Sequence, residues 1–239
     1  NAILLLQSGM PITVTQATAG NPEITTTSGQ AVTLGSGADI GSSTNTLEIG
    51  STTGAVSATA TGDAFLTGIG GLSLGSVSGV NVTLAAANAI TATGTVTGTT
   101  SVTLNSGAGV GTSTASRLAI GATSGSVNVT AGGDVFLSGA DLTFGSIGAG
   151  TGAIDVSSTG NIDATGTLTG GNITLEAAGG IGLGGAIALA PTGTTSLTTH
   201  GAAALGNVSV SYGAGGFSTS GVAVVTDGTG KQSETFATT

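Results

Sequence analysis

The stretch SVTLNSGAGVG, from Ser101 to Gly111, occurs in three versions along this chain. The other two are AVTLGSGADIG at Ala31–Gly41 and NITLEAAGGIG at Asn172–Gly182. Each version begins with an apolar–polar–apolar triplet and continues into a glycine-containing segment. Alternation of this kind predicts a β-strand with one buried side, and the glycines predict a tight corner behind it. The even separation of the three versions indicates an internal repeat.

A second pair of segments follows the same period. TGAVSATATGDAFLTG at Thr53–Gly68 resembles SGSVNVTAGGDVFLSG at Ser124–Gly139, and its aligned residues have the same separation. We therefore expect three superunits of about 70 residues. Within them an apolar–polar–apolar triplet recurs about three times per superunit. The triplets begin at Ile12, Val32, Val56, Val82, Val102, Val127, Ile154, Ile173, Leu197 and Val222.

The spacing of the triplets predicts the fold class. A period of roughly 19–27 residues with two or three short strands suits one coil of an all-β protein, a right-handed parallel β-helix or β-solenoid. The ten triplets predict about ten turns, with each triplet stacked on the next. The middle residues of the triplets are expected to face outward. Six of them would form one row of threonines: Thr13, Thr33, Thr83, Thr103, Thr174 and Thr198.

The chain is expected to form a single domain. Residues 1–226 would make the solenoid, and the polar residues 227–239 would serve as a C-terminal cap, tail or linker. Residues 1–11 hold the most apolar stretch, which predicts an end strand or an inter-subunit strand. Because an open strand edge invites another strand, we expect self-association end to end or by strand addition through Asn1–Gln7.

The composition excludes several classes of function. Only 5% of the 239 residues are charged, and 11 acids against two cations give a net charge of −9. A nucleic-acid partner is excluded because binding to phosphates requires clustered Lys and Arg. No apolar run approaches the roughly 18 residues of a transmembrane helix. The absence of cysteine removes disulfides and thiolate metal sites.

Two long segments carry a resemblance to a known family. NVTLAAANAITATGTVTGTTSVTL (Asn81–Leu104) and GAIDVSSTGNIDATGTLTGGNITLEAAGGI (Gly152–Ile181) resemble the repeat, or shaft, region of filamentous-haemagglutinin-like exoproteins and giant bacterial adhesins. The resemblance extends from Ile12 to about Val225 and implies an extracellular β-helix of a bacterial cell surface or secreted fibre. The secretion domain of that family carries an NPNG-type motif. Here only NPEI occurs, at Asn21–Ile24, so the resemblance is to the shaft.

The densest group of acids is the candidate for chemistry. Its members are Asp134, Asp141, Asp155 and Asp163. Carboxylate oxygens are ligands for calcium, which is the one metal or cofactor that these residues would hold. Paired carboxylates on a β-helix also serve polysaccharide-acting enzymes, and Arg117 is the only cation near these acids. The calcium-binding GGxGxDxUx repeat is missing.

Several other residues have a structural interpretation. Asp63 and Asp134 follow glycine at equivalent positions, which predicts corner carboxylates that accept backbone N–H groups. His200 is the only histidine and is expected in a loop. GIGLGG at Gly180–Gly185 matches a dinucleotide motif formally, but it lacks the acid about 20 residues further on. Asn81, Asn128, Asn172 and Asn207 begin N-x-S/T sequences, which predicts corner residues or glycosylation acceptors.

These observations predict a structural, non-catalytic protein. We expect an extracellular β-solenoid that acts as the shaft or self-assembling subunit of a bacterial surface fibre or adhesin, with the cell surface or glycans as partners. No catalytic or cofactor-binding residue is predicted. Two alternatives stay open: a polysaccharide-acting β-helix enzyme, and a solenoid whose threonine row binds a ligand or ice.

Overall fold

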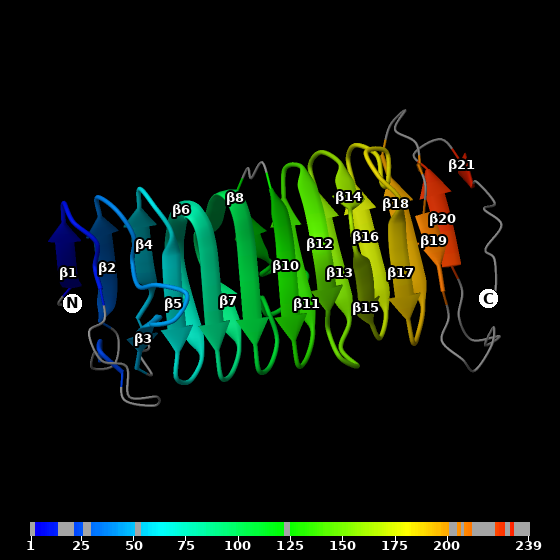
Figure 1. Cartoon of the computed structure of the whole chain (residues 1–239). Coiled ribbons are helices and arrows are strands. Elements are labelled where there is room, and N and C mark those ends of the chain that lie inside the picture. Colours follow the sequence, from blue (N-terminus) through cyan, green and yellow to red (C-terminus); the bar gives the residue numbers. More distant parts are fainter. Residues whose placement is uncertain are drawn as a thin grey trace.

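The computed structural model describes residues 3–13, 22–25, 30–50, 54–121, 125–200, 205–206, 208–211, 223–227 and 230–231. These residues form an elongated stack of β-strands that runs from β1 at one end to β20 and β21 at the other (Figure 1). No helix occurs within the described ranges. All pairings between strands are parallel except that of β20 with β21. The predicted all-β parallel solenoid is therefore confirmed.

The chain forms 21 strands, most of them short. They are β1 (Ile3–Ser8), β2 (Ala31–Ser36), β3 (Leu47–Ile49), β4 (Val56–Ala60), β5 (Ala64–Gly68), β6 (Leu72–Ala86), β7 (Ile90–Ala92), β8 (Thr95–Ser106), β9 (Leu118–Ile120), β10 (Ser126–Ala131) and β11 (Val135–Gly139). They continue as β12 (Leu142–Gly148), β13 (Ile154–Ser158), β14 (Ile162–Ala164), β15 (Thr167–Gly170), β16 (Ile173–Ala177), β17 (Ile187–Pro191), β18 (Thr195–Thr199), β19 (Val208–Val210), β20 (Ala223–Asp227) and β21 (Gly230–Lys231).

One unbroken column of paired residues gives the number of turns. Its nine members are Leu47, Leu66, Leu84, Leu104, Val129, Ile147, Leu168, Leu189 and Val210. Each step from one member to the next is one coil of the chain, so nine members make eight complete turns, fewer than the ten predicted from the triplets. Pairings of β1 with β2 and of β18 with β20 extend the stack at its two ends.

The inside of the stack is filled by small and medium aliphatic side chains. Strand residues alternate between buried and partly exposed positions, as in β2, where Val32, Leu34 and Ser36 point inward. Each fully buried Val, Leu or Ile contributes about 1.5–3 kcal/mol relative to an exposed one. Phe144 is the only aromatic residue of this core among the described residues. A core of such small side chains is sufficient, because every turn covers the one before it.

The predicted stacking of triplets is correct in only part of the chain. Val32 pairs with Val56, and Val82 pairs in turn with Val102, which pairs with Val127. Ile154 pairs with Ile173 as well. The other predicted pairs are wrong where the structure describes them: Ile12 pairs with Ile40, Val56 with Leu74, Val127 with Phe144, and Leu197 with Leu175. Val222 lies outside the described residues.

Two columns of buried residues show why these pairings differ. Column A comprises Ile12, Ile40, Ala64, Val82, Val102, Val127, Phe144 and Ala164. Column B comprises Leu72, Ile90, Val110, Val135, Ile154, Ile173 and Thr195. A single turn carries several similar triplets on its different sides. A series that takes one triplet from each period therefore passes from one side of the solenoid to another. The sequence itself does not mark the position of this change.

The superunit is consequently longer than three turns. Val102 and Ile173 are counterparts in the sequence repeat, but three turns from Val102 end at Ala164 in column A. Ile173 lies further along the chain, in column B, on another side of the same turn. Each superunit therefore covers close to three and a half turns. Equivalent strands of successive superunits lie on different sides of the solenoid as a result.

The same shift divides the predicted row of threonines. Thr83 and Thr103 are neighbours, as predicted. Thr33 instead pairs with Leu5 and Ser57. Thr174 pairs with Asp155 and Ser196, and Thr198 pairs with Glu176. The six threonines therefore do not form one row, and the prediction of that row is wrong.

Three buried serines fix the corners at which strands end. Ser36, Ser106 and Ser158 close β2, β8 and β13 and are between 4% and 7% exposed. The Oγ of Ser106 lies 2.8 Å from the carbonyl oxygen of Asn88 in the preceding turn and 2.9 Å from that of Gly109 in its own corner. Each serine hydroxyl thus lies within hydrogen-bond distance of one carbonyl oxygen in the preceding turn and one in its own corner, and links the two corners.

The two ends of the stack differ. At the N-terminal end β1 pairs in parallel with β2 and provides the first rung of the described stack. At the other end β20 continues to Asp227, one residue past the predicted boundary at 226, and pairs antiparallel with β21. Residues 228–229 and 232–239 of the predicted tail lie outside the described ranges.

Substitution of Gly107 tests the close stacking of corners. A Cβ atom at Gly107 would lie 2.0 Å from the backbone oxygen of Ala87 in the preceding turn, whereas a Cβ at Gly148 would meet nothing within 4 Å. We expect Gly107→Ala to lower the free energy of unfolding by about 1–3 kcal/mol because the turns must separate. Gly148→Ala should leave it unchanged or slightly raised. Urea unfolding followed by circular dichroism measures both, and equal midpoints would contradict this account.

Substitution of Thr195 is a test in which the free energy of unfolding is expected to rise. Its side chain is 1% exposed in column B, and its Oγ1 has no hydrogen-bond partner among the described residues. Thr195→Val removes the unpaired hydroxyl at nearly constant volume and should raise the free energy of unfolding by about 1 kcal/mol. Thr174→Val, a matched change at a partly exposed position, should stay within about 0.5 kcal/mol of the wild type. A lower unfolding midpoint for Thr195→Val would refute the assignment.

Candidate functional site

Three loops, the first two of them polar, interrupt the regular stack at equivalent positions of the three superunits. We call them loop I (Gly41–Thr46), loop II (Gly111–Arg117) and loop III (Gly182–Ala186). Their first residues are glycines with φ of 69°, 72° and 73°. At Gly111 this left-handed backbone excludes other residues, and a Cβ would also lie 2.5 Å from the oxygen of Phe136. The loops are therefore built into the repeat.

Backbone hydrogen bonds hold the base of each loop to the turn before it. The amides of Gly41, Gly111 and Gly182 donate to the carbonyl groups of Ile12, Ile90 and Ile162 at 2.8–2.9 Å. The carbonyl group just before each glycine accepts from the following turn, from the amides of Phe65, Phe136 and Gly206 at 2.7–2.8 Å. The residues at the base of each loop are therefore hydrogen-bonded to the turn before and to the turn after, which makes the base rigid.

The residue under each loop changes with the length of the loop. Phe65 and Phe136 lie under loops I and II and are partly exposed. Gly206 takes this place under loop III, which is the shortest of the three, and a Cβ there would lie 2.0 Å from the oxygen of Gly182. A long loop thus accompanies a phenylalanine, and the short loop lies too close to the next turn for any side chain.

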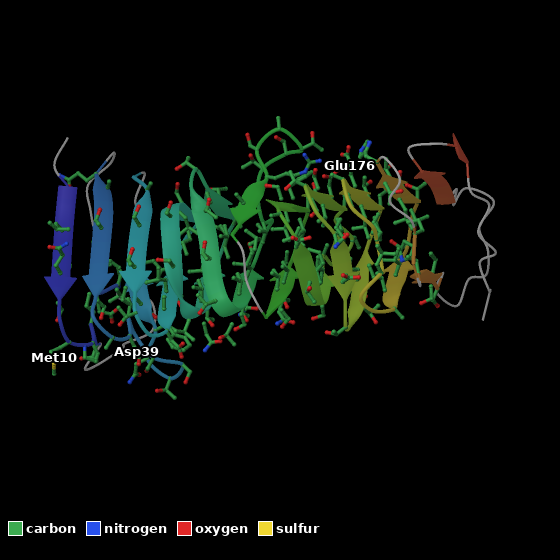
Figure 2. The ribbon with its side chains drawn as sticks, turned by 90° about the horizontal axis from the view of Figure 1, so that it is seen from above. Met10, Asp39 and Glu176 are labelled. Atoms are coloured by element: carbon green, nitrogen blue, oxygen red, sulfur yellow. The ribbon has the colours of Figure 1, made fainter. Side chains whose placement is uncertain are left out.

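The loops project from different sides of the solenoid. Ile40, before loop I, belongs to column A, and Ile181, before loop III, stacks in a column with Leu142 of β12, a strand that also contributes to column A. Val110, before loop II, belongs to column B. In Figure 2 the green loop II stands out from one long edge, and Asp39, two residues before loop I, lies at the opposite edge. The half-turn in the superunit produces this alternation.

Loop II is tied to a strand two turns away. Arg117 donates through Nε (2.8 Å) and Nη2 (2.5 Å) to Oδ1 of Asp155 in β13, and through Nη1 (2.7 Å) to the carbonyl oxygen of Thr114. The two charged side chains are 21% and 15% exposed. Asp155 pairs with Phe136 of β11, so the ion pair passes over the turn that contains Phe136. It is the only Arg or Lys ion pair among the described residues.

The acids of the corners accept backbone N–H groups from the next turn. Oδ1 of Asp141 accepts from the amide of Asn161 (2.8 Å), and Oδ1 of Asn161 accepts from Gly180 (2.8 Å). Oδ1 of Asp63 accepts both the backbone amide and the side-chain amide of Asn81, at 3.0 and 2.9 Å. The carboxylate role predicted for Asp63 is correct, but the donor lies one turn later and not two residues on. Side chains therefore continue the ladder around the corners.

The four acids predicted as a calcium or catalytic group are not brought together. Asp134 accepts from the amide of Ala153 (2.7 Å), and Asp163 accepts from Gly184 in loop III (2.7 Å). Asp155 is paired with Arg117, and Asp141 serves the corner described above. No group of three or more His, Cys, Asp or Glu side chains that could hold a metal ion occurs within the described ranges. Each acid is thus occupied separately by a local donor.

The remaining predicted residues lie in corners and loops. His200 follows β18, and its Nε2 lies 2.9 Å from Oε1 of Glu176 in the preceding turn, with both side chains about half exposed. Gly180–Gly185 contains the start of loop III. Oδ1 of Asn172 accepts from the amide and hydroxyl groups of Thr194 (2.8 and 3.0 Å). Asn207 lies outside the described residues.

The N-terminal edge is the second candidate site. Five large apolar side chains are exposed among the described residues, and three of them lie at this end: Leu5 at 56%, Leu6 at 38% and Met10 at 72%. β1 pairs with β2 on one side only within the described ranges. Figure 2 shows Met10 pointing away from this end of the rod. An apolar strand with a free edge is a site for strand addition.

No protein-family model, curated protein or solved structure matches this chain. Among the residues that the structure describes, no helix is long and apolar enough to cross a membrane.

The sequence predicted the corner role of Asp63 and Asp134, but not the three loops or the pairing of Arg117 with Asp155. A signal for the loops exists in hindsight: the segments between Ile40 and Leu47, Val110 and Leu118, and Ile181 and Ile187 differ in length while their flanks match. The ion pair has no such signal, because its partners are 38 residues apart and lie two turns from each other.

Replacement of Asp141 tests whether a corner acid binds a backbone group or a cation. Asp141→Ala removes the acceptor for the Asn161 amide and should lower the free energy of unfolding by about 1 kcal/mol. Asp141→Asn keeps an Oδ1 acceptor and should stay within about 0.5 kcal/mol of the wild type. We expect millimolar CaCl₂ or EDTA to leave the melting temperature of all three proteins unchanged. A calcium-dependent rise in the wild type that both variants lose would assign the acid to a cation site.

Proposed function

We propose that this chain is a non-catalytic shaft segment of a bacterial extracellular fibre or adhesin, and that copies of it associate through β1. The single observation behind the proposal is the uninterrupted parallel ladder that ends in an exposed apolar strand. A shaft needs a stiff and extensible body, and a solenoid provides this because every turn repeats the contacts of the one before. The resemblance of the repeat texture to adhesin shafts supports the same function.

The surface composition supports an extracellular shaft. Outward positions carry mostly Thr, Ser, Asn and Gly, and both arginine and lysine occur once each, as Arg117 and Lys231. The acids of the described corners accept backbone hydrogen bonds within the stack, so their polar atoms serve cohesion. Stability therefore depends little on screened surface charge, which suits a protein exposed to variable salt.

The edge of β1 supports association between copies. The carbonyl oxygen of Ser8 accepts from the amide of Gly37 (2.8 Å), so the backbone groups of Ser8 point toward β2. Because successive residues of a strand alternate in direction, those of Leu6 also point to β2, whereas those of Leu5 and Gln7 point to the free edge. A strand from a second copy that pairs there would cover the exposed Leu6 side chain and extend the core.

The variant Leu5→Pro tests this mechanism. Proline removes the N–H that points to the free edge and leaves the bonds between β1 and β2 in place. We expect wild-type protein to form end-to-end oligomers or filaments in electron micrographs and in sedimentation velocity, and Leu5→Pro to stay monomeric. Leu5→Val is the matched control, since it keeps the N–H and the strand propensity, and it should assemble like the wild type.

Point variants are preferable to a deletion of residues 1–9, because the deletion would uncover β2 with its apolar Val32 and Leu34 as a new edge. Assembly of Leu5→Pro at the wild-type rate would exclude β1 as the contact. A wild-type chain that remains monomeric at high concentration would reject self-association. Rods of uniform length in the micrographs would then still support the role of a shaft.

A further inference from the structure

Loop II contains a feature that the proposed function does not use. Arg117 is one of only two residues, with Lys231, after which a trypsin-class protease can cut this chain. Three exposed residues, Thr114, Ala115 and Ser116, precede it. Exposed polar loops are the usual places of proteolytic nicking in folded proteins. The bond between Arg117 and Leu118 therefore combines the residue that such proteases require with an accessible approach on one side.

The residues that follow this bond are held in the stack by strand pairing. Leu118 begins β9 and is fully buried. β9 pairs with β11 through Leu118–Leu137 and with β8 through Thr95–Ala119. The residues that follow the bond are thus paired with one strand in the preceding turn and one in the following turn. A protease, which needs an extended and accessible segment around the bond, can reach it only when the loop moves away from the stack.

The ion pair of Arg117 with Asp155 opposes this movement. The guanidinium group that a trypsin-class protease would bind is turned toward β13, where Nε and Nη2 both contact Oδ1 of Asp155. Its third bond, from Nη1 to the carbonyl oxygen of Thr114, holds the loop itself. The loop is further closed by hydrogen bonds between the amide of Thr112 and the oxygen of Ser116, and between the amide of Ser116 and the oxygen of Ser113.

We propose that the Arg117–Leu118 bond is a latent cleavage site for trypsin-class proteases, kept closed by the ion pair between Arg117 and Asp155. Cleavage adds one water molecule across the amide, which leaves a carboxylate on Arg117 and an ammonium group on Leu118. The two fragments remain joined because β8 of the first fragment pairs with β9 and β10 of the second. The pair therefore determines whether a shaft exposed to proteases stays continuous at its middle superunit.

Trypsin digestion of the full chain tests the proposal. The wild type should be cut slowly after Arg117, and cleavage after Lys231 serves as an internal reference. Asp155→Asn removes the charge at constant size, and we expect it to raise the rate of cleavage after Arg117 about tenfold, because proteolysis follows the population of the open loop. Mass spectrometry should then find fragments 1–117 and 118–231 or 118–239, which co-elute in gel filtration.

Matched variants separate the effect of the ion pair from a loss of stability. Asp163→Asn, the same change in β14, should be cut after Arg117 at the wild-type rate. Arg117→Lys keeps a cleavable residue but loses the forked contact, and should be cut several-fold faster than the wild type. If Asp155→Asn melts at a lower temperature than the wild type, the rate of cleavage after residue 117 is compared between Arg117→Lys and the wild type instead.

Two outcomes would overturn the proposal. The first is equal cleavage after Arg117 in the wild type, Asp155→Asn and Arg117→Lys, which would show that the ion pair does not control access. The second is complete resistance of both variants, which would show that the paired strand β9 protects the bond alone. Neither outcome depends on whether the chain associates through β1, so this test and the test of the proposed function fail independently.

Discussion

Every feature of this protein depends on the parallel hydrogen-bonded ladder between successive turns. The ladder requires inward side chains that stack on their counterparts, which explains the columns of Val, Ile and Leu along the core. It also brings the backbones of adjacent corners so close that Gly107 has no room for a side chain. A chain with so few charges and aromatic residues can fold because the backbone bonds are satisfied from turn to turn and each turn covers the last.

The polar residues extend this ladder where strands stop. Hydrogen bonds to backbone groups are formed by the serine hydroxyls at the ends of β2, β8 and β13. The carboxylates of Asp63 and Asp141 likewise accept backbone amides of the adjacent turn. This explains why the acids do not form a common site: Asp134 and Asp141 serve separate corners, Asp163 binds loop III, and Asp155 binds Arg117. The same geometry separates the predicted calcium ligands and divides the threonine row.

The half-turn in the superunit gives the solenoid its asymmetry. Equivalent segments such as those of Val102 and Ile173 face different neighbours, so one sequence pattern is placed in two environments. Loops I to III share a base of glycine and backbone hydrogen bonds, while their tips differ in length and chemistry. Arg117 in loop II is thereby brought to Asp155 of β13, and turns that are two apart are joined by a charge pair as well as by strands.

The sequence by itself determined the parallel β-solenoid, the inward and outward alternation of each strand, and the corner role of Asp63. These properties are local: alternation has a period of two residues, and corners carry their own glycine, serine and acid residues. Only the tertiary structure decided which triplet lies on which, where the loops project, and that Arg117 meets Asp155. Stacking is a long-range choice among several triplets of nearly equal composition in each turn. A local pattern cannot distinguish Leu74 from Val82 as the partner of Val56, whereas closure of the turn around a common core selects Leu74.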